Sequence, residues 1–184
     1  GTGMGGLTSM QTMFHGNLMG TPKPNDILQE VLPNVVAAHV MQSYVGGYGA
    51  MIHPVGACAT AAVSVEEGMD KIRLGKADLV VAGGFDDMTS DAITGFADMA
   101  ATADTEMMRA RGISDNRISR ANDRRLLGFL EAQGGGTILL ARGDLALRMG
   151  LPVLAVVAYA QSFADGADTT VRAPGLGALG AGRG

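Results

Sequence analysis

Residues 58–82 read CATAAVSVEEGMDKIRLGKADLVVA, a stretch that indicates an α/β architecture. Ala59–Leu74 is predicted to form a helix, because Gly75 follows as a favourable residue just beyond a helix end. Asp78–Ala82 is predicted to be a buried strand, and Met51–Val55 a short strand before the helix. Such a β-α-β unit predicts parallel strands joined by a right-handed crossover.

The predicted helix changes character along its length. Ala59–Val65 is small or apolar on every side, which predicts burial, whereas Glu66–Lys76 carries charges that predict contact with solvent. The alternation of elements predicts an α/β fold with a mainly parallel or mixed sheet. The other predicted elements are helices at Leu7–Phe14, from Asp26 (with Asn25 as N-cap) to Pro33, at Asn34–Ser43 (buried), at Ser90–Ala101 and at Asp144–Met149, strands at Gly135–Ala141 and Val153–Ala160, and a polar loop at Thr102–Asn122.

The composition limits the class of protein. The chain has 184 residues, 47% of them hydrophobic, which favours a folded domain over disorder. A net charge of −4 argues against a nucleic-acid partner. The apolar run Leu151–Ala160 is too short to span a bilayer, so no membrane partner is expected. A single cysteine allows no internal disulfide and fits a reducing compartment, so we expect a cytoplasmic protein.

The ends of the chain are rich in glycine and the first residue is not methionine. We therefore expect residues 1–184 to be part of one domain, truncated at both ends, of a longer polypeptide.

Cys58 is the candidate functional residue. One interpretation is a small core filler, because most free cysteines are buried. The other is a covalent nucleophile, because Cys58 lies at a strand-to-helix junction among small residues that leave room for a group on sulfur. The N–H groups of a helix N-terminus favour a thiolate and stabilise an oxyanion, so the junction favours the nucleophile.

A cysteine nucleophile usually has a histidine partner. The chain has His15, His39 and His53, none of which is a convincing base. His53 precedes Cys58 by only five residues along a predicted strand, and His39 lies on an apolar helix where a core role is more common. The sequence thus presents a nucleophile without its partners.

Two other motifs suggest different sites. GTGMGG, residues 1–6, fits the dinucleotide pattern, but Asp26, about 20 residues further on, follows a Pro-rich connector rather than a second strand, so a dinucleotide site is disfavoured. The alternative is that these glycines permit a close approach of the backbone. Asp86 and Asp87 suggest a metal-binding pair, but no His or Cys is near, so a hydrogen-bonded strand end is favoured. The 12 methionines are scattered and are interpreted as core filler.

The motifs VGACATAA, FADMAATA, SRANDRRLLGFLEAQGGG, GDLALRMGLPV and APGLGALG, in this order, resemble the β-ketoacyl synthases, or condensing enzymes. EAQGGG and NDILQE are most similar to the ketosynthase domain of microbial type I fatty acid synthases, which are multifunctional enzymes.

This resemblance implies a thiolase-like fold of α-β-α-β-α layers, a homodimer and an acyltransferase activity in fatty acid biosynthesis. It implies that Cys58 holds the acyl chain as a thioester, which malonyl on acyl carrier protein then extends to a 3-oxoacyl chain. The protein would bind no cofactor directly, because the phosphopantetheine arm of the carrier delivers substrates. Met4 and Phe96 match positions beside the acyl pocket, whereas Ala121 and Leu127 depart from the family pattern.

The resemblance leaves two alternatives and one gap. The alternatives are a non-catalytic scaffold or chain-length module with this fold, and a thiolase. A scaffold is expected to lack the cysteine, which this chain retains. The family also uses two histidines and a lysine, which are expected outside these residues, so the chain alone is expected to be inactive.

Overall fold

The computed structural model describes residues 1–46, 49–166 and 176–183. These residues pack as two compact units, one comprising Gly1–Asp87 with Gly134–Gly184 and the other Met88–Gln133. The first unit holds helices α1 (Leu7–Met19), α2 (Ile27–Glu30), α3 (Val35–Val40), α4 (Thr60–Arg73), α7 (Gly143–Arg148) and α8 (Gly177–Ala181), and strands β1 (Leu79–Asp86) and β2 (Gly134–Ala141); the second holds α5 (Ser90–Asp98) and α6 (Thr105–Ala110).

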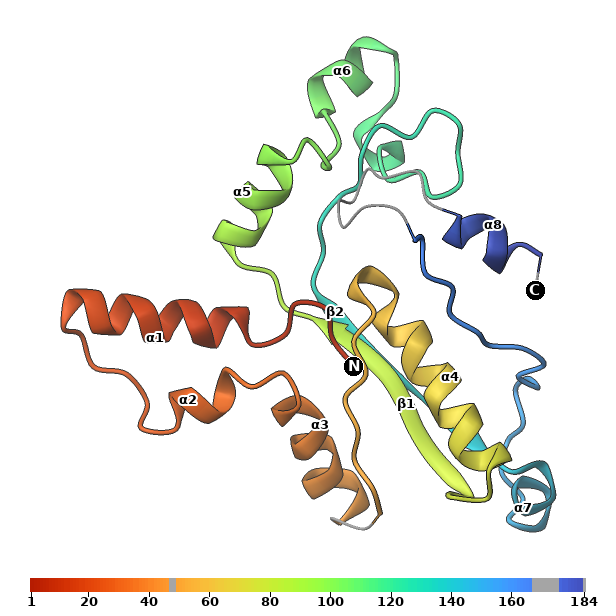
Figure 1. Ribbon diagram of the computed structural model, residues 1–184. Helices are drawn as coiled ribbons and strands as arrows, with labels where there is room; N and C mark the ends of the chain where they lie inside the picture. Colours follow the sequence, from red (N-terminus) through yellow and green to blue (C-terminus); the bar gives the residue numbers. More distant parts are fainter. Residues whose placement is uncertain (47–48, 167–175, 184) are drawn as a thin grey trace. The chain divides into compact units, whose positions relative to one another are not determined.

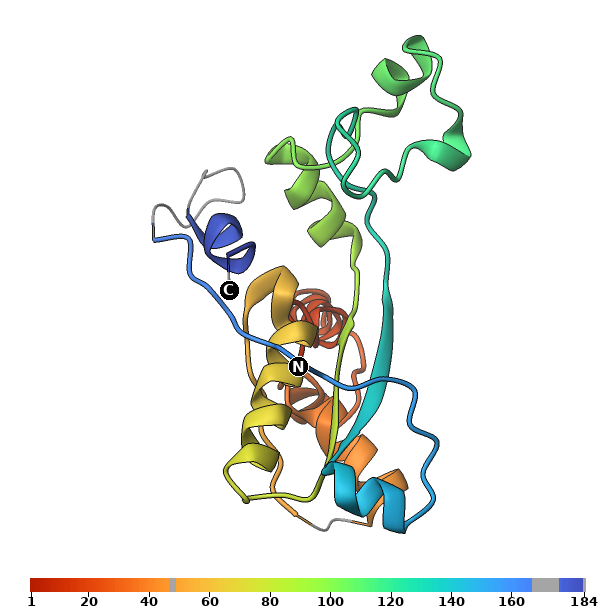
Figure 2. The same ribbon diagram turned by 90° about the vertical axis from the view of Figure 1, so that its right-hand side faces the viewer.

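The core of the first unit is helix α4 packed on the antiparallel pair β1–β2 (Figures 1 and 2). Four residues of the helix, Thr60, Ser64, Gly68 and Met69, are buried. At Gly68 a β-carbon would lie 2.8 Å from Leu140 Cδ1, so a glycine lets the helix approach the sheet closely. The strand register runs from Leu79 opposite Ala141 to Asp86 opposite Gly134.

The predicted parallel β-α-β unit is therefore wrong. Met51–Val55 and Val153–Ala160 contain no strand, and the partner of β1 is β2. Pro54 cannot donate to a strand ladder, which weakens the first of these segments as a strand. Strand β1 was expected to be buried, but several of its residues, Val81 among them, are exposed to solvent.

The burial predicted around the helices also differs from the structure. Ala59, Ala61 and Ala62 are exposed, so the start of α4 is not buried on all sides. Residues 34–43 form α3 followed by a π-helical turn at Met41–Val45, and no residue of either element is buried. The N-cap of α2 is Asp26 rather than Asn25. Helix α1 extends five residues beyond the predicted Phe14, to Met19.

The second unit contains more regular structure than its polar sequence predicted. Residues 102–122 include α6 and a 3-10 turn at Asp115–Arg117. Asp104 begins α6, because its carboxylate accepts from the Met107 N–H at 2.9 Å. Met108 is fully buried and forms the centre of this small unit.

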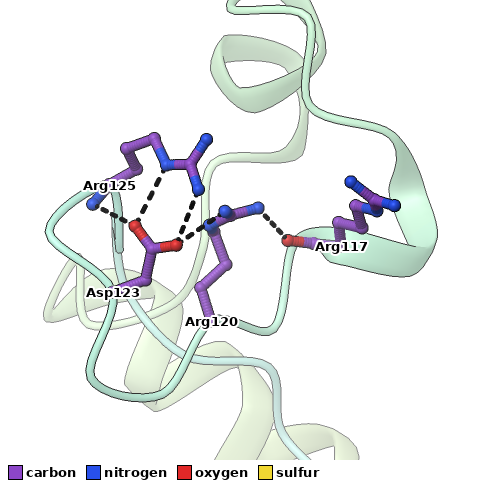
Figure 3. A network of polar contacts seen from close by, with 4 residues as sticks. All are labelled: Arg117, Arg120, Asp123 and Arg125. Atoms are coloured by element: carbon purple, nitrogen blue, oxygen red, sulfur yellow. Dashed lines mark hydrogen bonds and ion pairs between the residues drawn. The ribbon is translucent and has the colours of Figure 1, made fainter.

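An ionic network lies in the same unit, around Ala121 in the chain. Asp123 accepts from the Arg120 guanidinium at 2.7 Å and from Arg125 at 2.9 Å (Figure 3). The side chain of Arg120 is only 10% exposed. Hydrogen bonds from Arg125, together with those from Arg120, hold the pKa of Asp123 well below its usual range.

None of the helices that the structure describes is both long and apolar enough to cross a membrane.

Candidate functional site

Cys58 occupies a 3-10 turn, Ala57–Ala59, that leads directly into α4. Its thiol is free and exposed, which contradicts the core-filler interpretation for the chain as described. The 14 residues of α4 begin two positions later, so the sulfur lies at the positive end of a long helix.

The backbone of this turn is strained. Ala57 has φ +49°, in the left-handed region that alanine rarely adopts. The Ala59 N–H closes the turn by donating to the Gly56 carbonyl at 3.0 Å. The Thr60 hydroxyl accepts from the Gly56 N–H at 2.8 Å and donates to the Ala57 carbonyl at 2.7 Å. The junction is one of loop and helix rather than the predicted strand and helix, since residues 51–55 form no strand. The strained turn is the feature that it shares with the strand-to-helix turns on which nucleophiles are presented.

The glycine loop at residues 1–6 lies against the turn. A β-carbon on Gly3 would lie 2.8 Å from the Ala57 carbonyl oxygen, so only glycine fits this approach. The Thr2 hydroxyl orders the loop, since it accepts from the Gly5 N–H at 2.6 Å and donates to Asp86 at 3.3 Å. The loop leads straight into α1, and Asp26 begins α2 rather than following a strand, so the dinucleotide interpretation does not fit.

A cavity of about 140 Å³ opens beside the thiol. Four segments line it: the glycine loop, the cysteine turn with the first turn of α4, the end of β1 and the start of β2. Its lining residues are Gly1, Thr2, Gly3, Ala57, Cys58, Thr60, Ala61, Gly84, Phe85, Asp86 and Gly134. A buried cavity on the order of 150 Å³ admits a benzene molecule, so this one has room for the reacting end of a small acyl group.

The two aspartates at the end of β1 are hydrogen-bonded, as predicted. Asp87 accepts from the N–H of Thr8 at 3.1 Å and from its hydroxyl at 2.7 Å, which caps the N-terminus of α1. Asp86 accepts from Thr2. Among the described residues no cluster of three or more His, Cys, Asp or Glu side chains could bind a metal ion.

The histidines do not join Cys58 in this site. His15 is exposed, and His39 lies 3.5 Å from Glu30 with 58% of its side chain exposed, so the predicted core role of His39 is wrong. His53 is half-buried, its two ring nitrogens have no hydrogen-bond partner among the described residues, and burial lowers its pKa. None of the three belongs to the cavity lining given above.

The two predicted pocket residues lie in different units. Met4 is a half-buried residue of the glycine loop but does not line the cavity beside Cys58. Phe96, on α5, packs edge-to-face on Phe129 with ring centroids 5.1 Å apart. Their roles at an acyl pocket remain predictions. The sequence analysis missed Thr60 and Thr2, whose hydroxyl groups hydrogen-bond to the backbone of the cysteine turn and of the glycine loop. Threonine often makes such local hydrogen bonds, but nothing in the sequence shows that these two residues do so.

Known proteins resemble this chain over most of its length. Residues 1–146 match the family described as Beta-ketoacyl synthase, N-terminal domain. The fatty acid synthase alpha subunit stcJ of Emericella nidulans is 38% identical over 179 residues, which are 97% of this chain and 12% of that protein. The fatty acid synthase subunit alpha of Saccharomyces cerevisiae is 38% identical over 97% of this chain and 10% of its own length. The chain thus spans about a tenth of these relatives.

Solved structures show the same fold. The ketosynthase FabY from P. aeruginosa superposes with a TM-score of 0.76 and 25% identity, over 96% of this chain and 29% of that one. A beta-ketoacyl synthase from Burkholderia phymatum gives 0.69 with 19% identity, over 83% of this chain and 36% of that one. The predicted thiolase-like fold class is confirmed, although the local strand pairing was not predicted.

Proposed function

Because the chain belongs to the β-ketoacyl synthase family, we propose that it acts in the condensation step of fatty acid synthesis, with Cys58 as the acyl acceptor. The observation that carries the proposal is the placement of this thiol. It is exposed, on a strained turn at the N-terminus of α4, beside a cavity lined mostly by glycine and other small residues, with Phe85 and Asp86.

The proposed reaction begins with acyl transfer. The Cys58 thiolate attacks the thioester carbonyl of an acyl chain on the phosphopantetheine arm of acyl carrier protein. A carbon–sulfur bond forms to Cys58 and the old one breaks, so that the phosphopantetheine sulfur leaves as a thiolate and takes up the proton that Cys58 lost when it ionised. The helix N-terminus favours the thiolate, and the Cys58 N–H is the proposed donor to the oxyanion.

The second half of the reaction consumes the thioester. A malonyl group on the carrier loses carbon dioxide, and the electrons of the broken bond form a carbanion that attacks the acyl carbon. Cys58 leaves as thiolate, and a 3-oxoacyl chain two carbons longer remains on the carrier. The chain's own histidines do not line the cavity, so we assign the decarboxylation step to groups supplied by the rest of the domain.

The proposal also names partners. Acyl carrier protein supplies both substrates, a second ketosynthase chain forms the dimer, and other fatty acid synthase domains act on the product. The relatives named fatty acid synthase subunits support an association with such domains.

The test is intact-mass and peptide-mass analysis of the full-length protein after exposure to a long-chain acyl thioester. We expect a hydroxylamine-labile adduct on the peptide that contains Cys58, and no such adduct in Cys58→Ala. A folded wild-type protein without this adduct would refute the nucleophile and favour a non-catalytic scaffold. Formation of 3-oxoacyl product from malonyl carrier separates condensation from the reverse, thiolase-type reaction.

A further inference from the structure

We infer that Thr60 is a positioning residue that fixes the turn carrying Cys58; the inference rests on the proposed role of Cys58 as acyl acceptor. Thr60 is the first residue of α4 and only 3% exposed. Its hydroxyl uses its one proton toward the Ala57 carbonyl and a lone pair toward the Gly56 N–H. No reacting group needs to contact Thr60 for this role.

The two hydrogen bonds act on either side of the strained residue. The Gly56 N–H lies before Ala57 in the chain and the Ala57 carbonyl lies after its α-carbon, so one hydroxyl ties both ends of the segment to α4. A non-glycine residue at φ +49° persists only where its surroundings enforce that conformation. Because Cys58 is the next residue, the dihedrals of Ala57 set the direction in which the thiol leaves the backbone.

The methyl group of Thr60 has a separate contact. Of the atoms around a β-carbon built on Gly1, Thr60 Cγ2 is the nearest, so the methyl group packs directly against the glycine loop. Thr60 also lines the cavity beside the thiol. One side chain therefore joins the glycine loop, the turn and the helix, which are three of the segments that surround Cys58.

Ser64 provides a matched control one helical turn further on. It is 8% exposed, and its hydroxyl lies 2.7 Å from the Ala61 carbonyl and 2.8 Å from the Gly83 carbonyl. Ser64 therefore fastens α4 to β1, as a buried hydroxyl that does not touch the cysteine turn. If loss of any buried hydroxyl on this helix lowered activity equally, Thr60 would have no special role.

The experiment measures the rate of Cys58 acylation against acyl thioester concentration in the full-length protein, by quenched intact mass. For Thr60→Val we expect the limiting rate to fall about 10- to 100-fold, because a displacement of a reacting group by about 1 Å costs up to that much. The half-saturating concentration is expected to stay within about twofold. Thr60→Ser, which keeps the hydroxyl, and Ser64→Ala are expected to stay within about threefold of the wild-type rate.

The outcomes separate this inference from the proposed function. A wild-type protein that is not acylated refutes the role of Cys58 and the positioning role with it. If the wild type is acylated, two results refute the positioning role alone. One is a Thr60→Val acylation rate within threefold of wild type, and the other is a fall in the Ser64→Ala rate as large as that in Thr60→Val. If Thr60→Val does not fold, Thr60→Ala, which also removes the hydroxyl, takes its place, and a rate within about threefold of wild type then refutes the inference.

Discussion

Replacing Gly84 by alanine tests how closely α4 must approach β1 at the site. A β-carbon at this position would lie 2.7 Å from Ala61 Cβ and 3.1 Å from Ala61 Cα. Ordinary carbon contacts are about 3.5–4.0 Å, so the helix must move away by roughly 1 Å. Ala61 lies in the first turn of α4 and cannot rotate its methyl group out of the way, so the shift falls on the backbone near Cys58.

The expected magnitude follows from two opposing effects. Overpacking of a close contact costs about 1–3 kcal/mol. Alanine in place of glycine within a strand recovers about 0.5–1 kcal/mol of backbone entropy. The middle of these two ranges gives a net loss of about 1.3 kcal/mol in the free energy of local opening, which corresponds to roughly 8-fold faster hydrogen exchange of the α4 and β1 amides.

The assay is hydrogen exchange with mass spectrometry on the full-length protein, with Gly136→Ala as the matched control. Gly136 lies directly opposite Gly84 in the register, yet no described atom lies within 4 Å of its β-carbon position. The control is expected to leave protection unchanged or to raise it. Equal protection in Gly84→Ala and Gly136→Ala would show that the close approach of α4 to β1 does not limit local stability.

Two further changes test hydrogen bonds that aspartate carboxylates accept. Asp87→Ala removes the cap on α1 by leaving the Thr8 N–H without its acceptor; we expect a loss of about 1 kcal/mol, seen as faster exchange of the first turn of α1, and unchanged exchange would contradict the cap. Asp123, with its pKa lowered by Arg125 and Arg120, stabilises the folded state above about pH 4, the pKa of an unfolded aspartate, and loses this contribution as pH falls. Protection of residues 88–133 should therefore fall less between pH 7 and pH 3 in Asp123→Asn than in wild type, and equal falls would refute the linkage.

The parts of the fold that follow from local chemistry were predictable from the sequence. Helix α4 ends where Gly75, with φ +67°, was expected to follow it, and Gly135–Ala141 forms most of β2. The pairing of β1 with β2 was not predictable, because the partner of Leu79–Asp86 follows after more than 40 intervening residues. Long-range pairing depends on packing of the whole unit and leaves little trace in a short window of sequence.

The candidate site likewise has a part that the sequence predicts and a part that it does not. Cys58 could be singled out because a small-residue junction before a helix is visible in the sequence. The role of Thr60 could not, because its two hydrogen bonds depend on the left-handed conformation of Ala57, which an alanine does not predict.

The pairing of Asp86 with Gly134 has a consequence for how this architecture can vary. Residues 87–133 connect two residues that are paired in the sheet, so both ends of this segment are held at a fixed short separation. Halving or doubling such a segment changes the chain-closure free energy by only about 0.6 kcal/mol. Insertions, deletions or grafts between these two residues can therefore diversify this segment during evolution or engineering while Cys58 and the turn that carries it are inherited unchanged.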